Sequence, residues 1–163
     1  MRVVDIAEQS SAEDLVELDQ VERASAGCPG KDEAGRLGER AVFGFSPLEA
    51  ARYVDEFNSP AVGWHFDVGN VITFGWPEQW IRILGKRIQK LHIKEYSRKK
   101  RDNEGLWKGF QVPFLEGDND WPAIMKALDD IGYNGWGIAE QGGGDTIEGL
   151  KDLSARMTKI FAS

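Results

Sequence analysis

Three side chains that commonly bind metal ions stand at or near the ends of short apolar stretches. They are Asp67 in FDVGN, His92 in LHIKE and Glu140 in GIAEQ. Two carboxylates and an imidazole suit Mn²⁺, Mg²⁺, Co²⁺ or Zn²⁺, and the lack of a thiolate excludes a cysteine-rich structural zinc site. Each residue also has a plainer interpretation, because Asp67 and Glu140 can begin turns and His92 can pack in a core. A metal site requires that all three meet in the fold.

Strands and helices alternate along the chain from residue 46 onward. The predicted strands are 61–67, 88–95 and 135–140, and the predicted helices are 47–57, 77–86, 121–131 and 146–161. This order is typical of an α/β fold with a parallel sheet, in which ligands bind at the carboxyl ends of the strands. Asp67, His92 and Glu140 all fall at that edge. His65 lies deeper in its strand and is interpreted as structural.

Two helix starts can be identified from their capping residues. Ser46, Pro47 and Glu49 form the pattern of a capping box with proline at the first helical position. Asp145, followed three residues later by Glu148, predicts the N-cap of the last helix. These signals fix where the first and last predicted helices begin.

Length and charge exclude several classes of protein. The chain has 163 residues and a formal net charge of −7, which suits one globular domain and argues against nucleic acid as a partner. No apolar run approaches the ~18 residues of a membrane span, so no membrane partner is predicted. The single cysteine, Cys28, excludes an internal disulfide, and the chain does not begin with a signal-peptide pattern. A cytoplasmic protein is predicted.

The two parts of the chain differ in composition. All 17 aromatic residues lie at Phe43 or later, and residues 1–42 carry a glycine-rich patch and one weak helical pattern. Such a segment buries little apolar surface. We therefore expect an atypical, weakly structured segment over 1–42 and a folded domain over 43–163.

The stretches VGWHFDVGN, KLHIKEYS and FLEGDNDWPAIMKALDDIGYNGWGIAEQ resemble the sugar-phosphate isomerase/epimerase family, whose members have a xylose isomerase-like TIM barrel. This family includes ketose 3-epimerases, pentulose-phosphate epimerases and hydroxypyruvate isomerases. The resemblance runs from about Ser46 to the C-terminus. It implies the C-terminal half of a (β/α)₈ barrel, with parallel strands inside and helices outside.

The resemblance also implies the roles of particular residues. Family members hold one divalent metal, here Mn²⁺ foremost, and Asp67, His92 and Glu140 match the second, third and fourth ligands. Glu140 matches a glutamate that also acts as a catalytic acid and base. Arg98, six residues after the histidine, matches a substrate-binding arginine. Asn70 stands where some members have a substrate-binding histidine.

The implied reaction is proton transfer next to the carbonyl of a sugar or sugar phosphate. A metal stabilises the enediolate, and a carboxylate moves the proton. Epimerisation needs a base on each face of the substrate, whereas aldose–ketose isomerisation can use one. Lys94 and Arg98 follow the histidine, so the rim is predicted to be less negative than the protein average, which suits an anionic sugar phosphate. The expected long loop 97–119 carries further cations, Lys99 and Lys100, that can bind a phosphate.

A complete barrel takes about 250 residues, so this chain is expected to be a truncated form. The first glutamate ligand of the family has only a weak candidate here, Glu39. Two predicted functions, one enzymatic and one not, therefore stay open. The chain is either the catalytic half of a metal-dependent isomerase or epimerase, or an inactive half-barrel that serves as a remnant or an interaction module and forms a homo-oligomer through its sheet edges. A zinc-dependent DNA-repair endonuclease of the same superfamily is disfavoured, because the chain has two histidines.

Overall fold

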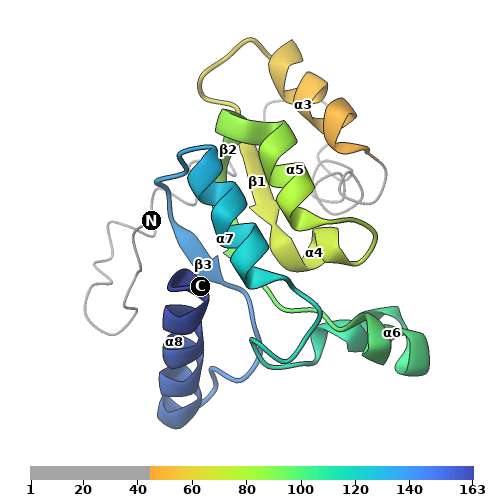
Figure 1. Ribbon diagram of the computed structural model, residues 1–163, viewed down its shortest axis with the longest axis vertical. Helices are drawn as coiled ribbons and strands as arrows, with labels where there is room; N and C mark the ends of the chain where they lie inside the picture. The colour runs from red at the N-terminus through yellow and green to blue at the C-terminus, as the bar shows by residue number, and fades with distance from the viewer. Residues whose placement is uncertain (1–44) are drawn as a thin grey trace. The chain divides into compact units, whose positions relative to one another are not determined.

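The computed structural model describes residues 45–163, an α/β arrangement in which strands alternate with helices (Figure 1). The expectations about residues 1–42 and Glu39 lie outside the described residues. The strands are β1 (Trp64–Asp67), β2 (Ile88–Ile93) and β3 (Gly137–Ala139). The helices are α3 (Pro47–Glu56), α4 (Val68–Ile72), α5 (Pro77–Leu84), α6 (Arg98–Glu104), α7 (Trp121–Asp130) and α8 (Ile147–Phe161), with 3₁₀ turns η1 (Gly85–Arg87) and η2 (Leu106–Phe110).

The three strands form one parallel sheet in the order β1-β2-β3, which confirms the predicted topology. Asp67 is aligned with His92, and His92 is aligned with Ile138. The ladder continues past the end of β3, because the Glu140 N–H donates to the Ile93 carbonyl at 3.0 Å. The register therefore brings the carboxyl ends of all three strands to one edge.

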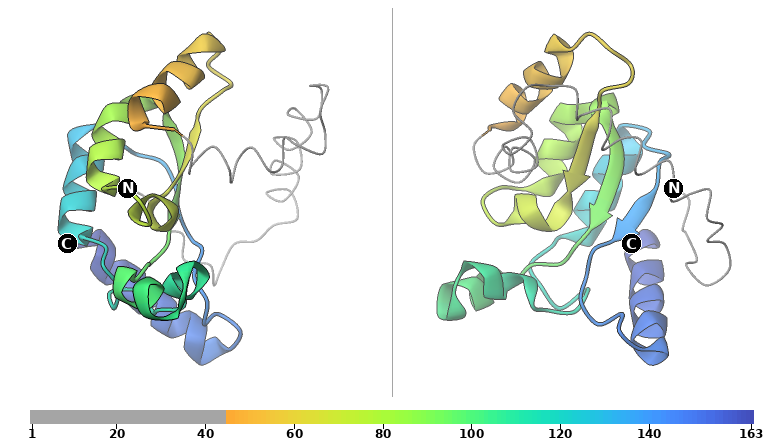
Figure 2. Two further views of the ribbon diagram at one scale, coloured as in Figure 1. Left: turned by 90° about the vertical axis from the view of Figure 1, so that its right-hand side faces the viewer. Right: turned by 180° about the vertical axis from the view of Figure 1, so that it is seen from behind.

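The helices α5 and α7 pack side by side against one face of the sheet (Figure 2). Strand residues on that face are buried and apolar, among them Phe66, Leu91 and Ile93. Because side chains alternate between faces, the neighbours of these residues point the other way. His92, between two fully buried residues, is thereby directed away from the helices. The alternation of side chains along β2 thus places Leu91 and Ile93 in the core and His92 on the opposite face of the sheet.

The predicted strands are longer than the observed ones. Ala61 lies in a turn that follows Pro60, and the Val62 N–H donates to the Ser59 carbonyl at 3.2 Å. This turn bonding keeps residues 61–63 out of the ladder. The capping box of α3 is present as predicted: Ser46 N donates to Glu49 Oε2 at 2.8 Å, and Glu49 N donates to Ser46 Oγ at 3.3 Å.

Two expectations about the later helices are wrong. The N-cap of α8 is Thr146 rather than Asp145, because the Thr146 hydroxyl accepts from Gly149 N at 3.0 Å. The segment 97–119 is not a plain loop, since it contains α6 and η2. Ser97 begins α6 by accepting from Lys100 N at 3.2 Å. Among the described residues, no helix is both long enough and apolar enough to cross a membrane.

Candidate metal centre

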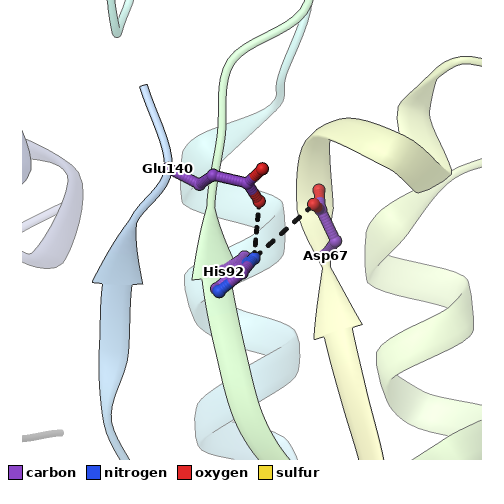
Figure 3. A group of neighbouring side chains, drawn as sticks. All are labelled: Asp67, His92 and Glu140. Atoms are coloured by element: carbon purple, nitrogen blue, oxygen red, sulfur yellow. Dashed lines mark ion pairs between the residues drawn. The ribbon is translucent and has the colours of Figure 1, made fainter. Parts of the chain in front are cut away.

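Asp67, His92 and Glu140 converge at the carboxyl ends of the three strands (Figure 3). His92 Nδ1 lies 2.6 Å from Glu140 Oε2 and 3.8 Å from Asp67 Oδ2. One potential ligand atom from each residue lies within 4.8 Å of the others. The three side chains therefore lie close together, as predicted.

Asp67 holds its position through a helix cap. It is the last residue of β1 and the N-cap of α4, and its Oδ1 accepts from Asn70 N at 2.8 Å. The other oxygen, Oδ2, faces His92 and Lys94. Burial raises the pKa of Asp67, but His92, the Asn70 N–H and Lys94 together outweigh burial and lower it. The side chain is therefore a carboxylate at neutral pH.

His92 presents Nδ1 to both carboxylates while its ring packs edge-on against the His65 ring, with centroids 4.0 Å apart. Asp67 raises the pKa of His92, burial opposes this, and the charge of Glu140 adds to the rise. His65 is exposed and its ring packs against this ring; its structural role stays a prediction.

Lys94 occupies the same cluster. Its Nζ lies 2.9 Å from Glu140 Oε1 and 3.7 Å from Asp67 Oδ2. The stem of Lys94 passes close to Gly69 in α4: a Cβ added at Gly69 would lie 2.7 Å from Lys94 Cγ. Because Gly69 has no side chain, the stem of Lys94 can pass over it and the Lys94 ammonium can reach the two carboxylates. The predicted cation at the rim is present in Lys94.

The side chains of Arg98 and Asn70 make no hydrogen bond or ion pair with Asp67, His92 or Glu140, and both residues make other contacts. The Arg98 guanidinium donates to the carbonyls of Ile72 at 2.9 Å and Gly75 at 2.7 Å, which ties α6 to the last residue of α4 and to the segment that follows it. Asn70 uses its backbone N–H to bind Asp67 and its carbonyl to accept from Thr73 Oγ1 at 2.6 Å. The roles of Arg98 and Asn70 in substrate binding stay predictions.

A second buried carboxylate, Glu95, was not identified from the sequence. Its side chain is fully buried and accepts four N–H groups. The donors are Leu115 N at 2.8 Å, Trp121 Nε1 at 2.8 Å, Tyr96 N at 3.3 Å and Asn119 N at 3.3 Å. Burial raises the pKa of Glu95, and these N–H groups oppose the rise. Glu95 thereby holds the segment that follows β2 in place. The one feature of the sequence that could have pointed to Glu95 is its position next to Lys94.

Gln141 joins this segment to the end of β3. Its Oε1 accepts from Glu95 N at 2.8 Å, and its Nε2 donates to the carbonyls of Val112 at 2.6 Å and Phe110 at 3.2 Å. The residue directly after Glu140 therefore holds the segments after β2 and β3 together. This network restricts the backbone on both sides of the three converging side chains.

The donor set fits a divalent cation. Two carboxylates and one imidazole nitrogen approach one another closely enough to share an ion, since each would lie roughly 2.0–2.6 Å from it. Glu140 is 47% exposed, so part of its carboxylate is open to solvent. Asp67 ends β1 and is held by its hydrogen bond from Asn70 N, and His92 lies within β2. Two of the three side chains therefore stand on ordered strands, which suits a preorganised site.

Comparisons with known proteins agree with this architecture. A xylose isomerase domain protein from Planctomyces limnophilus is 20% identical with a TM-score of 0.60, covering 83% of this chain and 54% of that one. A D-allulose 3-epimerase from Methylomonas sp. is 18% identical with a TM-score of 0.54, covering 72% of this chain and 42% of that one. At these identities the likeness shows the fold.

A sequence relative has similar partial coverage. An uncharacterized protein of Methanocaldococcus jannaschii is 28% identical over 97 residues, which is 59% of this chain and 31% of that protein. The chain thus spans about half or less of the length of the proteins that it matches. The family model described as "Xylose isomerase-like TIM barrel" matches residues 37–159, most of the chain. The chain belongs to the xylose isomerase-like TIM barrel family, of whose fold it forms a part.

Proposed function

We propose that this chain forms the metal-binding half of a sugar or sugar-phosphate isomerase or epimerase. The observation that carries the proposal is the convergence of Asp67, His92 and Glu140 at the carboxyl edge of a parallel sheet. Ligand sites of such folds lie at that edge. Membership of the family and a fold shared with a D-allulose 3-epimerase support the choice of substrate class.

Asp67, His92 and Glu140 would hold the divalent cation, with Mn²⁺ as the first choice and Mg²⁺, Co²⁺ or Zn²⁺ as alternatives. When bound, such an ion supplies Lewis-acid polarisation of the ketose carbonyl, which makes the neighbouring C–H more acidic. Glu140 is the general base, because its carboxylate is the more exposed of the two and can reach a substrate proton from the solvent side. Asp67 stays fixed by its cap and orients the ligand set.

Lys94, Arg98 and Asn70 are proposed to contact the substrate. Lys94 Nζ already lies among the carboxylates, where it can donate to a substrate hydroxyl or phosphate oxygen. Arg98 uses Nε and Nη2 on backbone carbonyls, so its contribution to substrate binding would come through Nη1. Glu140 serves one face of the substrate, which suffices for isomerisation, whereas epimerisation needs a second base.

An inactive half-barrel is the second candidate function. It is favoured by the two open edges of the sheet, since within residues 45–163 β1 and β3 each pair with one strand. In this reading the sheet serves as an interaction module. The two readings differ in one property, which is turnover.

Hydrogen exchange on a ketose separates the two readings. We expect the Mn²⁺-loaded chain in D₂O to incorporate deuterium next to the carbonyl of D-fructose, as followed by NMR of the sugar. Glu140→Gln should lower the exchange rate by about 100-fold or more, because it removes the general base. Glu104→Gln, on an exposed glutamate in α6, is the matched control and should exchange like the native chain. If exchange does not exceed that of free Mn²⁺ although the protein binds the ion, the chain is the inactive half-barrel.

A further inference from the structure

The connection between α7 and β3 contains an asparagine followed directly by a glycine, Asn134 and Gly135. Such pairs commonly form tight turns in which both residues have a positive φ. Neither Asn134 nor Gly135 has a positive φ here, whereas Gly132 has a φ of 69°. The left-handed residue of this turn is therefore Gly132, and the Asn134–Gly135 pair lies in the part of the connection that leads into the strand.

Packing explains why residue 135 is a glycine. A Cβ added at Gly135 would lie 2.5 Å from Tyr133 Oη, which is closer than van der Waals contact allows. Any larger residue would therefore have to displace the Tyr133 ring. As a result, the backbone nitrogen of Gly135 has no side chain of its own residue that would block an approaching group.

The side chain of Asn134 is exposed and is not held by a hydrogen bond. Within residues 45–163, neither this side chain nor the Gly135 N–H takes part in a hydrogen bond. Other asparagines differ in this respect: Asn119 is half-buried and donates its side-chain amide to a backbone carbonyl at 2.8 Å, and Asn103 lies within α6. The amide of Asn134 and the nitrogen of Gly135 are therefore free to approach each other in water.

We propose that Asn134 is a modification site that deamidates without an enzyme. The Gly135 nitrogen loses its proton to base and attacks the side-chain carbonyl carbon of Asn134. A C–N bond forms, the side-chain nitrogen leaves as ammonia, and the product is a cyclic succinimide. Water then opens the ring at either carbonyl, which gives aspartate or isoaspartate. Water is the one co-reactant that is consumed, and nothing is oxidised or reduced.

Isoaspartate at this position alters the chain that enters β3, because it adds one CH₂ group to the main chain between Tyr133 and Trp136. Tyr133 donates its hydroxyl to the Trp136 carbonyl at 2.9 Å, and the same carbonyl accepts from Leu91 N in β2 at 3.3 Å. Both hydrogen bonds depend on the length of chain between residues 133 and 136. Isoaspartate therefore weakens the pairing of β3 with β2, whereas aspartate adds a charge and keeps the length. The inference is independent of the proposed function.

Mass spectrometry tests the reaction itself. The native chain is incubated in ¹⁸O-labelled water at mildly alkaline pH and then digested in ordinary water, so that a label marks only what reacted before digestion. The peptide with Asn134 should take up ¹⁸O, because the ring opens by addition of water. Asn58 and Asn103 are internal controls that should stay unlabelled, since both are exposed but neither precedes a glycine. In Asn134→Ser, which has no side-chain amide, the uptake in this peptide should disappear.

Absence of label at Asn134, or equal label at Asn58 and Asn103, would overturn the proposed site. Unfolding in urea tests the effect on β3. After incubation the native chain should unfold at a lower urea concentration than before it, whereas Asn134→Ser should not change.

A second variant separates the two products. Asn134→Asp carries the charge without the added CH₂ group and should unfold at the same urea concentration as the fresh native chain. An unchanged midpoint in an incubated native chain that carries the label would overturn the effect on β3. An equal loss in incubated Asn134→Ser would overturn it as well, because the loss would then not come from Asn134.

Discussion

The carboxylate of Asp67 uses its two oxygens for different purposes. Oδ1 caps α4 through Asn70 N, and Oδ2 faces His92 and Lys94. From the sequence, a turn cap and a metal ligand were alternatives, because residue type and spacing fit both. They coexist because a cap requires one acceptor atom and a carboxylate has two. At this scale the sequence was sufficient to name the three residues that converge and to place Lys94 at the rim, but it did not indicate that the Lys94 ammonium would contact both carboxylates.

Lys94 would compete with a bound metal ion for the carboxylates of Asp67 and Glu140. Replacing it by methionine keeps an apolar stem against Gly69 and removes the charge. We expect Lys94→Met to bind Mn²⁺ about fivefold more tightly or better, because two unit charges ~4 Å apart interact by ~1 kcal/mol even in bulk water. Calorimetric titration measures this, with Lys99→Met on an exposed lysine as the control. Weaker binding by Lys94→Met would show that the ammonium orders the carboxylates instead of competing with the ion.

Glu95 is expected to be important for stability. Each carboxylate oxygen of Glu95 accepts two N–H groups in the native protein. In Glu95→Gln an NH₂ group replaces one of these oxygens, so two N–H donors lose their acceptor. The free energy of unfolding in urea should fall by about 2–3 kcal/mol, the cost of leaving buried donors unpaired. Glu104→Gln, which is exposed, should leave it unchanged. A loss below 0.5 kcal/mol, on the order of an ordinary surface substitution, would mean that Glu95 does not hold this segment.

At the scale of the elements, sequence patterns identified the long helices and all three strands, and missed the short helices α4 and α6. The α5 and α7 helices have clear apolar faces that pack in the core. The α6 helix, RKKRDNE, has no buried residue and hence no apolar period to read. Contacts far along the chain stabilise it instead, such as the donation from Arg101 Nη1 to the Thr73 carbonyl at 2.8 Å. Such contacts depend on the tertiary fold and leave no local pattern.

Arg98 is expected to connect α6 with the segment after α4. Its guanidinium binds two carbonyls at once, which the single ammonium of a lysine cannot reproduce. Arg98→Lys should therefore lower the free energy of unfolding by about 1–2 kcal/mol in a urea titration. Arg52→Lys, on the exposed side of α3, is the matched control. An unchanged unfolding free energy combined with weaker ketose binding would assign Arg98 to the substrate alone.

At the scale of the whole molecule, the number of strands decided the fold. The alternation of strands and helices predicted a parallel sheet, and the family resemblance implied that this sheet is part of a barrel; the chain covers 54% of the Planctomyces protein that shares its fold. The helices α5 and α7 lie on one side of the sheet, as in the outer layer of a barrel (Figure 2). Within residues 45–163 the sequence does not indicate what the open edges of β1 and β3 pair with, because the pairing of an edge strand depends on its neighbour and leaves no local pattern.

The outer strands should promote self-association. Within residues 45–163, β1 and β3 each pair with one strand, so each keeps one edge of unpaired backbone groups. We expect light scattering after gel filtration to give a mass above that of the 18.2 kDa chain that rises with concentration. Ile138→Lys, which places a charge on β3, should reduce the association. A constant monomer mass for the native chain would argue against the interaction module.

Binding of Mn²⁺ tests most directly whether Asp67, His92 and Glu140 form a metal site. Calorimetric titration should give one ion per native chain, and binding at least about tenfold weaker for Asp67→Asn and His92→Ala, because each loses one ligand. Asp67→Asn is the sharper variant, since asparagine still caps α4 and thus removes the ligand while keeping the turn. Asp129→Asn, on an exposed aspartate of α7, is the control and should bind like the native chain. Equal Mn²⁺ affinity of all four proteins would contradict the account and leave Asp67 as a helix cap alone.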